Sequence, residues 1–309
     1  MSKESRLAFF KENYDLIFNG YFGKGKKIFI GDKKLNECRF CGKKYPVVKF
    51  RTAAHAIPEF LGNRQLILLN ECDDCNKFFS ENLETHLDKY TRPFRTIAGI
   101  QGKEGVPSYR SKDKKTRVAV KNAIEVSTPL ESDFFELHES PKELKLNFEK
   151  EPYIPAAVYK AFCKIAISII NDPSELSAFK VTIKWLFTLD HSRSPMQPLK
   201  ILVTFIPGPR PFQKVEVFLL RKKNGIKIMH SIFLIGFGNF FFQLVVPSHL
   251  DVSLGENYIV TLPHYPLPFE DHPIYGKAAF GFLDFSSADK KSEKLPISFK
   301  YESLIKGIG

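Results

Sequence analysis

The chain has 309 residues, and 43% of them are hydrophobic, which excludes a largely disordered protein. This length is enough for about two domains. The formal net charge is +12, and residues 1–128 carry +10 of it, with 25 Lys and Arg against 15 Asp and Glu. Basic charge concentrated in the first part of the chain favours a polyanionic partner such as nucleic acid, although a solvated basic face without a ligand would have the same composition.

Neither the N-terminus nor the most apolar run suggests export or a membrane. The first residues are charged throughout, unlike a signal peptide. The apolar run at 232–246 is interrupted by Gly, Asn and Gln, and it is too short for a spanning helix. The five cysteines do not form the pattern of a secreted disulfide framework, since four of them lie in two Cys-x-x-Cys pairs. We therefore expect a cytoplasmic protein that contacts no membrane.

The N-terminal segment predicts a short amphipathic helix followed by a flexible link. Leu7, Phe10, Tyr14 and Ile17 recur at helical spacing, as on the docking face of a helix. The sequence that follows, 20–27, is rich in Gly and Lys. We interpret it as a loop.

The segment 36–90 predicts the order strand, loop, strand, helix. An extended, β-prone run at 47–55 is followed by a loop at 61–64 and a second strand at 66–70. From Cys75 onward, apolar residues recur every three to four positions with charges between them. This order is that of a ββα unit.

Residues 91–118 are rich in Gly and basic residues, and they form either a disordered linker or a surface that contacts phosphate. Beyond them, short strands alternate from about 118 to 150, and helices are predicted at 156–170 and 173–187. Further strands, separated by Pro and Gly, are predicted at 201–206, 215–220, 228–235, 240–246, 258–262, 278–285 and 297–301. The expected fold class is α+β, a ββα module followed by a larger part rich in antiparallel strands.

The two Cys-x-x-Cys pairs flank the predicted strands of the ββα unit. They are Cys38 with Cys41 and Cys72 with Cys75. Four thiolates suit tetrahedral zinc, and an ion with four sulfur ligands has no open position for chemistry. We therefore predict a structural zinc ion that contributes on the order of 10 kcal/mol to folding of the module.

Between the two pairs lies His55, followed by Ile57-Pro58, and Asn76 comes directly after the last cysteine. This combination resembles the HNH endonucleases, also called ββα-metal or His-Me finger nucleases, in the branch that carries a four-cysteine zinc site. The resemblance implies an endonuclease that hydrolyses phosphodiester bonds in nucleic acid, double-stranded DNA being the expected substrate, with Mg²⁺ or Mn²⁺ as catalytic ion.

The resemblance also implies roles for individual residues. His55 would deprotonate the attacking water, and Asn76 would offer an amide oxygen to the catalytic ion, unless it only caps the helix. Many family members have an acidic metal ligand directly before the histidine, where this chain has Ala54. We expect Glu59, four residues after His55, to supply the missing oxygen.

The family's middle asparagine has two candidates in this chain, Asn70 and Asn63. Asn70 lies two residues before the third cysteine, and Asn63 lies in the loop between the predicted strands. We predict that Asn70 orients the strand of His55 and so belongs to the catalytic set.

These observations predict two domains. Residues 1–118 would hold the nuclease with its N-terminal helix and basic arm, and 119–309 would form an α+β domain for recognition, sensing or partner binding. Such an arrangement suits a bacterial restriction or antiphage defence effector, with the second domain binding a second copy, a partner protein or a small ligand. The alternative is a zinc-ribbon nucleic-acid-binding protein whose nuclease centre has decayed, for which Ala54 is the main argument.

Overall fold

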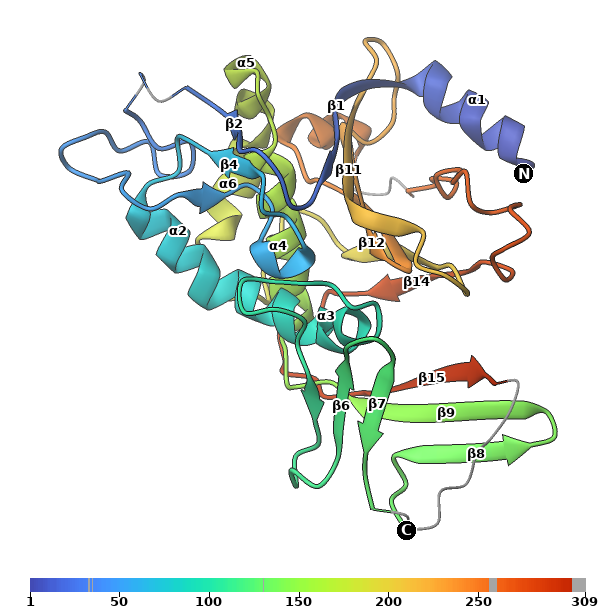
Figure 1. Ribbon diagram of the computed structural model, residues 1–309. Helices are drawn as coiled ribbons and strands as arrows, with labels where there is room; N and C mark the ends of the chain where they lie inside the picture. Colours follow the sequence, from blue (N-terminus) through green and yellow to red (C-terminus); the bar gives the residue numbers. More distant parts are fainter. Residues whose placement is uncertain (33, 35, 130, 256–259, 302–309) are drawn as a thin grey trace.

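The computed structural model describes residues 1–309 except 33, 35, 130, 256–259 and 302–309. Helices and mainly antiparallel strands are combined as an α+β fold, which confirms the predicted class (Figure 1). Among the described residues, no helix has the length and apolar character that crossing a bilayer requires.

The largest element is a six-stranded antiparallel sheet. Its strands, in spatial order, are β1 (Tyr14–Phe22), β11 (Phe212–Lys222), β12 (Ser231–Gly238), β13 (Phe240–Val245), β10 (Lys200–Phe205) and β14 (Ala279–Asp284). Every residue of β12 is buried, which explains why this segment has no charged side chain. The apolar run at 232–246 is therefore a pair of neighbouring central strands.

The N-terminal helix is shorter than its sequence pattern predicts. Helix α1 (Lys3–Asn13) begins at the cap Ser2, whose hydroxyl accepts a hydrogen bond from the Ser5 amide. Tyr14 and Ile17, which we expected on the helix, lie in β1. Tyr14 pairs with Lys222 of β11, and Ile17 lies at the register shift between Leu16 and Phe18. The pairing of the whole strand with β11 outweighs the helical spacing of the side chains.

One helix lies at the centre of the molecule. All residues of α4 (Pro155–Ser168) are buried, in agreement with the buried helix expected at 156–170. The helix predicted at 173–187 is divided into α5 (Pro173–Leu176) and α6 (Lys180–Leu186) by a 3₁₀ turn. Pro begins both α4 and α5, where its missing N–H costs nothing.

The predicted ββα unit is confirmed. Strands β3 (Ala54–His55) and β4 (Leu66–Leu68) pair antiparallel, and β2 (Ile28–Ile30) adds to β4 in parallel. The helix runs as α2 (Asp73–Phe79), a π-helical turn at Ser80–Glu84 and α3 (Thr85–Ile97). Of the extended run at 47–55, only the last two residues form a strand.

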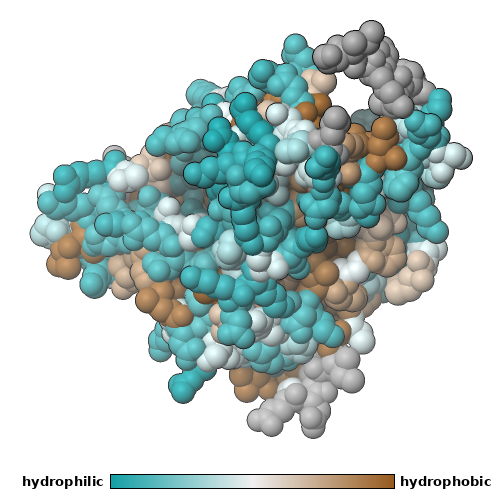
Figure 2. Space-filling model, turned by 90° about the horizontal axis from the view of Figure 1, so that it is seen from below, coloured by the Kyte–Doolittle hydropathy of each residue, from teal (hydrophilic) through white to brown (hydrophobic). Residues whose placement is uncertain are grey.

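Two small sheets lie at the end of the molecule that is lowest in Figure 1. They contain β5 (Tyr109–Arg110), β6 (Arg117–Val120) and β7 (Ile124–Ser127), and β8 (Phe135–Glu139), β9 (Lys142–Glu149) and β15 (Lys294–Lys300). The basic arm expected at 91–118 is thus partly α3 and partly sheet. Figure 2 views this end and shows a largely hydrophilic surface with hydrophobic side chains in separate groups. The strand expected at 258–262 begins among residues that the structure does not describe.

A single core connects the ββα unit to the rest of the chain. Helix α4 packs against the π turn and α3 on one side and against β12 on the other. Buried residues from the cysteine segment, from α4 and from the large sheet belong to one hydrophobic cluster. The predicted parts 1–118 and 119–309 therefore share a core, and β1 of the first part lies in the sheet of the second. The boundary at 118/119 stays a prediction.

Candidate active site and zinc centre

The four paired cysteines converge on one point. The sulfur atoms of Cys38, Cys41, Cys72 and Cys75 all lie within 4.8 Å of one another, and the Cys41 and Cys72 sulfurs are 3.8 Å apart. Tetrahedral zinc with Zn–S bonds of about 2.3 Å requires sulfur separations of about 3.8 Å. The donor set therefore fits one zinc ion, as the spacing predicts.

The thiols cannot all ionise in this space without a cation. A hydrogen bond from the Cys75 thiol lowers the pKa of Cys38 to about 5. Burial raises the pKa of Cys72 to about 12. One thiolate is thus favoured and a second beside it is disfavoured, a conflict that a bound divalent cation removes.

His55 lies at the end of β3, in the hairpin that the cysteines flank. Ala54 pairs with Leu68 and His55 with Ile67, so the two neighbouring side chains point to opposite faces of the sheet. Ala54 is buried and has no oxygen to offer. The His55 Nε2 lies 3.7 Å from a carboxylate oxygen of Glu59, which begins the 3₁₀ turn Glu59–Leu61.

The imidazole of His55 is largely enclosed. Its side chain is 16% exposed, and its Nδ1 is buried without a hydrogen-bond partner in the described part of the chain. Burial lowers the pKa of His55 more than the carboxylate of Glu59 raises it. The ring is therefore neutral near pH 7, as a proton acceptor must be.

The helix that follows the cysteines begins at the zinc centre. Cys72 is the N-cap of α2, and the amide of Asn76 donates to the Cys72 carbonyl at 2.9 Å. Asn76 is half-buried, and no hydrogen bond joins its side chain to His55 or Glu59 within the described residues. Its amide oxygen and the Glu59 carboxylate are hard donors of the kind that Mg²⁺ and Mn²⁺ accept.

Comparison with known proteins agrees with this geometry. Residues 38–91 match the HNH endonuclease family. The matched stretch contains the four cysteines, His55, Glu59 and Asn76, and it ends within α3. No curated protein and no solved structure matches the chain.

Within this HNH module, the two candidate asparagines make different contacts. The buried Asn63 side chain donates to the carbonyls of Ile57 and Leu66, at 2.7 and 3.2 Å. Its oxygen accepts from the amides of Gln65 and Leu66, so it ties the loop across the β3–β4 hairpin. The Leu66 carbonyl also accepts a hydrogen bond from the Ala56 amide. Asn63 is thus connected through Leu66 to Ala56, the residue that follows His55.

Asn70 instead holds the zinc knuckle. Its side-chain oxygen accepts from Arg39 Nε at 3.1 Å, and its carbonyl accepts from the Arg39 amide. The Arg39 guanidinium also donates to three carbonyls at the C-terminal end of α4, those of Ile167, Ser168 and Ile170. The catalytic assignment of Asn70 stays a prediction, and its contacts lie on the side of the module that faces α4.

Sequence reasoning missed an ion cluster between the HNH module and α4. The ammonium of Lys164 lies 3.2 Å from Glu71 and 3.1 Å from Glu84, and the side chains of Lys164 and Glu71 are completely buried. Burial raises the pKa of Glu71 to about 7, and neither of its oxygens accepts a hydrogen bond of regular geometry. A signal was present in the sequence: Lys160 and Lys164 are the only charges on an otherwise apolar helix.

A groove of about 490 Å³ runs along the helix beside this cluster. It is lined by Phe60 of the turn that carries Glu59 and by residues of the π turn and the start of α3, namely Ser80, Glu81, Glu84, Thr85 and Asp88. π turns inside α-helices are frequent at functional sites. The groove places further acidic side chains next to the turn that carries Glu59.

Proposed function

We propose that this protein is a metal-dependent endonuclease that hydrolyses phosphodiester bonds in DNA. The observation that carries the proposal is the match of residues 38–91 to the HNH endonuclease family, in a segment where His55 lies 3.7 Å from the carboxylate of Glu59. The basic charge of residues 1–128 supports a nucleic-acid substrate.

Each residue of the site would have a distinct part in the reaction. His55 accepts a proton from water at Nε2, and the neighbouring carboxylate of Glu59 stabilises the imidazolium that results. Glu59 and Asn76 would hold Mg²⁺ or Mn²⁺, which supplies positive charge against the phosphate and the leaving oxygen. Asn70 and Asn63 are the candidates for holding the hairpin, and the contacts of Asn63 favour it. The four cysteines would hold structural zinc and take no part in the chemistry.

The remainder of the chain is proposed to decide when and where the nuclease cuts. A ββα module contacts the phosphodiester backbone with little base selectivity, so specificity must come from other residues. We propose double-stranded DNA as substrate, a cytoplasmic location and a role in restriction or antiphage defence. One active site cuts one strand, so cleavage of both strands would require a homodimer or two successive nicks.

The direct test is plasmid cleavage with and without Mg²⁺ or Mn²⁺. We expect nicked product only with the ion, and a loss of at least about 10²-fold in His55→Ala, the size of a general-base contribution. His138→Ala is the matched control, because His138 is exposed and lies in β8, outside the module. Zinc content and thermal unfolding of both variants show whether they are folded.

The same assay tests the alternative, a nucleic-acid-binding protein with a decayed nuclease centre. The observation that favours it is Ala54, where the family commonly has an acidic ligand. Salt-dependent DNA binding by the folded protein, without cutting under any metal condition, would support this alternative and refute the nuclease.

A further inference from the structure

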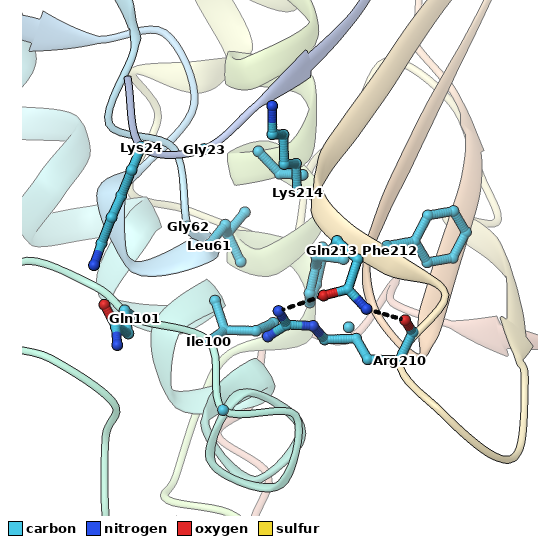
Figure 3. Close-up of a pocket in the computed structure, with 14 residues that line it drawn as sticks. Gly23, Lys24, Leu61, Gly62, Ile100, Gln101, Arg210, Phe212, Gln213 and Lys214 are labelled. Carbon is cyan, nitrogen blue, oxygen red and sulfur yellow. Dashed lines mark hydrogen bonds between the residues drawn. The ribbon is translucent and has the colours of Figure 1, made fainter. Parts of the chain in front are cut away.

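A second cavity lies where the HNH module meets the large sheet. It has a volume of about 330 Å³, within the range of small-molecule sites. Its walls come from three distant parts of the chain: the link after β1 with Lys24, the segment 61–101 with Leu61 and Ile100, and β11 with Gln213 and Lys214 (Figure 3). Arg210 completes the wall.

The charge of this cavity is uniformly positive. Lys24, Arg210 and Lys214 line it together with uncharged residues, and no Asp or Glu does. In the described part of the chain, no carboxylate lies within 4 Å of any of these three cations. Cations that share a concave surface without counter-charges favour an anionic ligand.

Two neutral groups hold Arg210 in place. Its guanidinium donates to the Ala98 carbonyl at 2.8 Å. It also donates to the Gln213 side-chain oxygen at 2.9 Å (Figure 3). Burial lowers the pKa of Arg210. A partly desolvated guanidinium with no anionic partner is costly, and a bound anion would offset that cost.

The backbone of β11 is irregular at the cavity. Its pairing with β12 shifts register between Phe212 and Glu216, so Gln213 and Lys214 are successive exposed positions in place of an alternating pair. On its other edge β11 pairs with β1, and the last pair is Val215 with Phe22. Strand β1 ends there, and the chain leaves the sheet at Gly23. Bulges of this kind redirect side chains and recur next to binding sites.

The floor of the cavity is apolar and closely packed. Leu61, Ile100 and Phe237 contribute to it. Gly238 has a φ of +60°, and a Cβ there would lie 2.8 Å from the Ala98 Cβ, so only glycine lets the sheet approach the module this closely. An apolar floor beside the held guanidinium of Arg210 and two exposed lysines suits a ligand with a planar or sugar portion and a charged end.

We propose that this cavity binds a small phosphate-bearing molecule of mononucleotide size. The cations would bind the phosphate, and the apolar floor would contact the uncharged portion. Phosphate is the anion that matches the fork of Arg210 and the point charges of the two lysines. The limited volume favours a small molecule over a nucleic-acid strand, which requires a longer groove.

The test is calorimetric titration of the full chain with adenosine monophosphate, pyrophosphate and uncharged adenosine. We expect saturable binding of one equivalent of adenosine monophosphate and much weaker binding of adenosine. Lys24→Met and Lys214→Met should each weaken binding about tenfold, the effect of losing one charge-assisted hydrogen bond. Lys227→Met, an exposed lysine between β11 and β12, is the matched control and should bind as the parent does.

The proposal concerns binding and does not depend on nuclease activity. Failure of both adenosine monophosphate and pyrophosphate to bind would overturn it, as would equal binding by Lys214→Met and the parent protein. Titration with a short oligonucleotide tests whether the cavity instead binds the phosphates of a nucleic-acid strand. If only the oligonucleotide binds, and Lys24→Met and Lys214→Met weaken it, the cavity belongs to the path of a nucleic-acid strand and the proposal is wrong.

Discussion

Two asparagines near the hairpin differ in what their side chains support. Asn63 satisfies two carbonyls and two amides in the loop that joins β3 and β4, all in a fully buried position. Asn70 accepts one side-chain hydrogen bond, from Arg39. Because a buried polar group left without a partner costs more than a hydrogen bond gains, the two residues should differ in energy.

We predict that Asn63→Ala lowers the free energy of unfolding by about 3 kcal/mol, since it leaves several buried backbone groups unpaired. Asn70→Ala should cost about 1.5 kcal/mol, the lower end of the range for one hydrogen bond to a charged group. Urea denaturation of the two variants measures the difference. A larger loss for Asn70→Ala would show that the hairpin does not depend on the Asn63 contacts.

Arg39 shows how one residue outside any motif docks the zinc knuckle. Its guanidinium binds the last carbonyls of α4, where the helix leaves acceptors unsatisfied and the macrodipole favours a cation. We predict that Arg39→Met destabilises the protein by about 3 kcal/mol, because the carbonyls lose a charged donor.

The measurement is chemical denaturation with Arg51→Met as control. Arg51 is also basic and belongs to the same module, but its side chain is 74% exposed and only approaches Asp73 at 4.0 Å. Its substitution should change stability by less than about 0.5 kcal/mol. Equal effects of the two substitutions would refute the docking role of Arg39.

At the scale of elements, α1 is attached to the sheet through an ion pair with the segment before β14. Arg6 contacts both carboxylate oxygens of Glu270, one at 3.1 Å, and both side chains are largely buried. Although burial alone would raise the pKa of Glu270, the hydrogen bond from Arg6 holds it below the usual 4.5. The ion pair therefore stabilises the fold above pH 4.5, and the contribution is lost as the pH falls below that value.

We expect Glu270→Gln to lower the free energy of unfolding at pH 7 by about 2 kcal/mol, the value of hydrogen bonds to a charged group. The difference between parent and variant should shrink as the pH is lowered from 4.5, because protonation removes the same charge from the parent. Urea midpoints at pH 7, 4.5 and 3 measure it. A difference that is constant over this range would exclude the ion pair as its cause.

At the scale of the whole molecule, the HNH module and the remaining chain are folded around α4 as one body. Lys164 of this helix contacts Glu71 and Glu84 of the module, and the hydrophobic cluster is continuous across the contact. Zinc binding at the cysteines should therefore stabilise more of the protein than the matched segment alone.

We predict that removal of zinc by a chelator unfolds the module and lowers the thermal midpoint of the entire chain, because zinc supplies on the order of 10 kcal/mol in small metal-dependent units. The parent should contain one zinc ion per chain, and Cys75→Ser should lose it. Cys163→Ala is the control, since Cys163 is buried in α4 apart from the cluster. Metal analysis and calorimetry test this, and a chelator without effect on the midpoint would contradict it.

Local sequence patterns were enough to predict the four-cysteine cluster, the position of His55 between the cysteine pairs and the α+β class. Cys-x-x-Cys spacing directs two sulfurs to one point through local turn geometry alone, and strand and helix periodicities are likewise local. The start of α2 at the cysteines and the burial of α4 were predictable for the same reason.

Only the long-range contacts of the folded chain decide which asparagine ties the hairpin, that Lys164 bridges two glutamates of the module, and that Tyr14 and Ile17 lie in a sheet strand. These facts depend on contacts between residues far apart in the chain, such as Arg39 with the end of α4. The cationic cavity has the same origin, because Lys24, Ile100 and Lys214 become neighbours only when β1 joins β11 beside the module. No local pattern encodes such contacts. Bringing residues that are far apart in the chain together costs conformational entropy, and only the packing of the complete core offsets that cost.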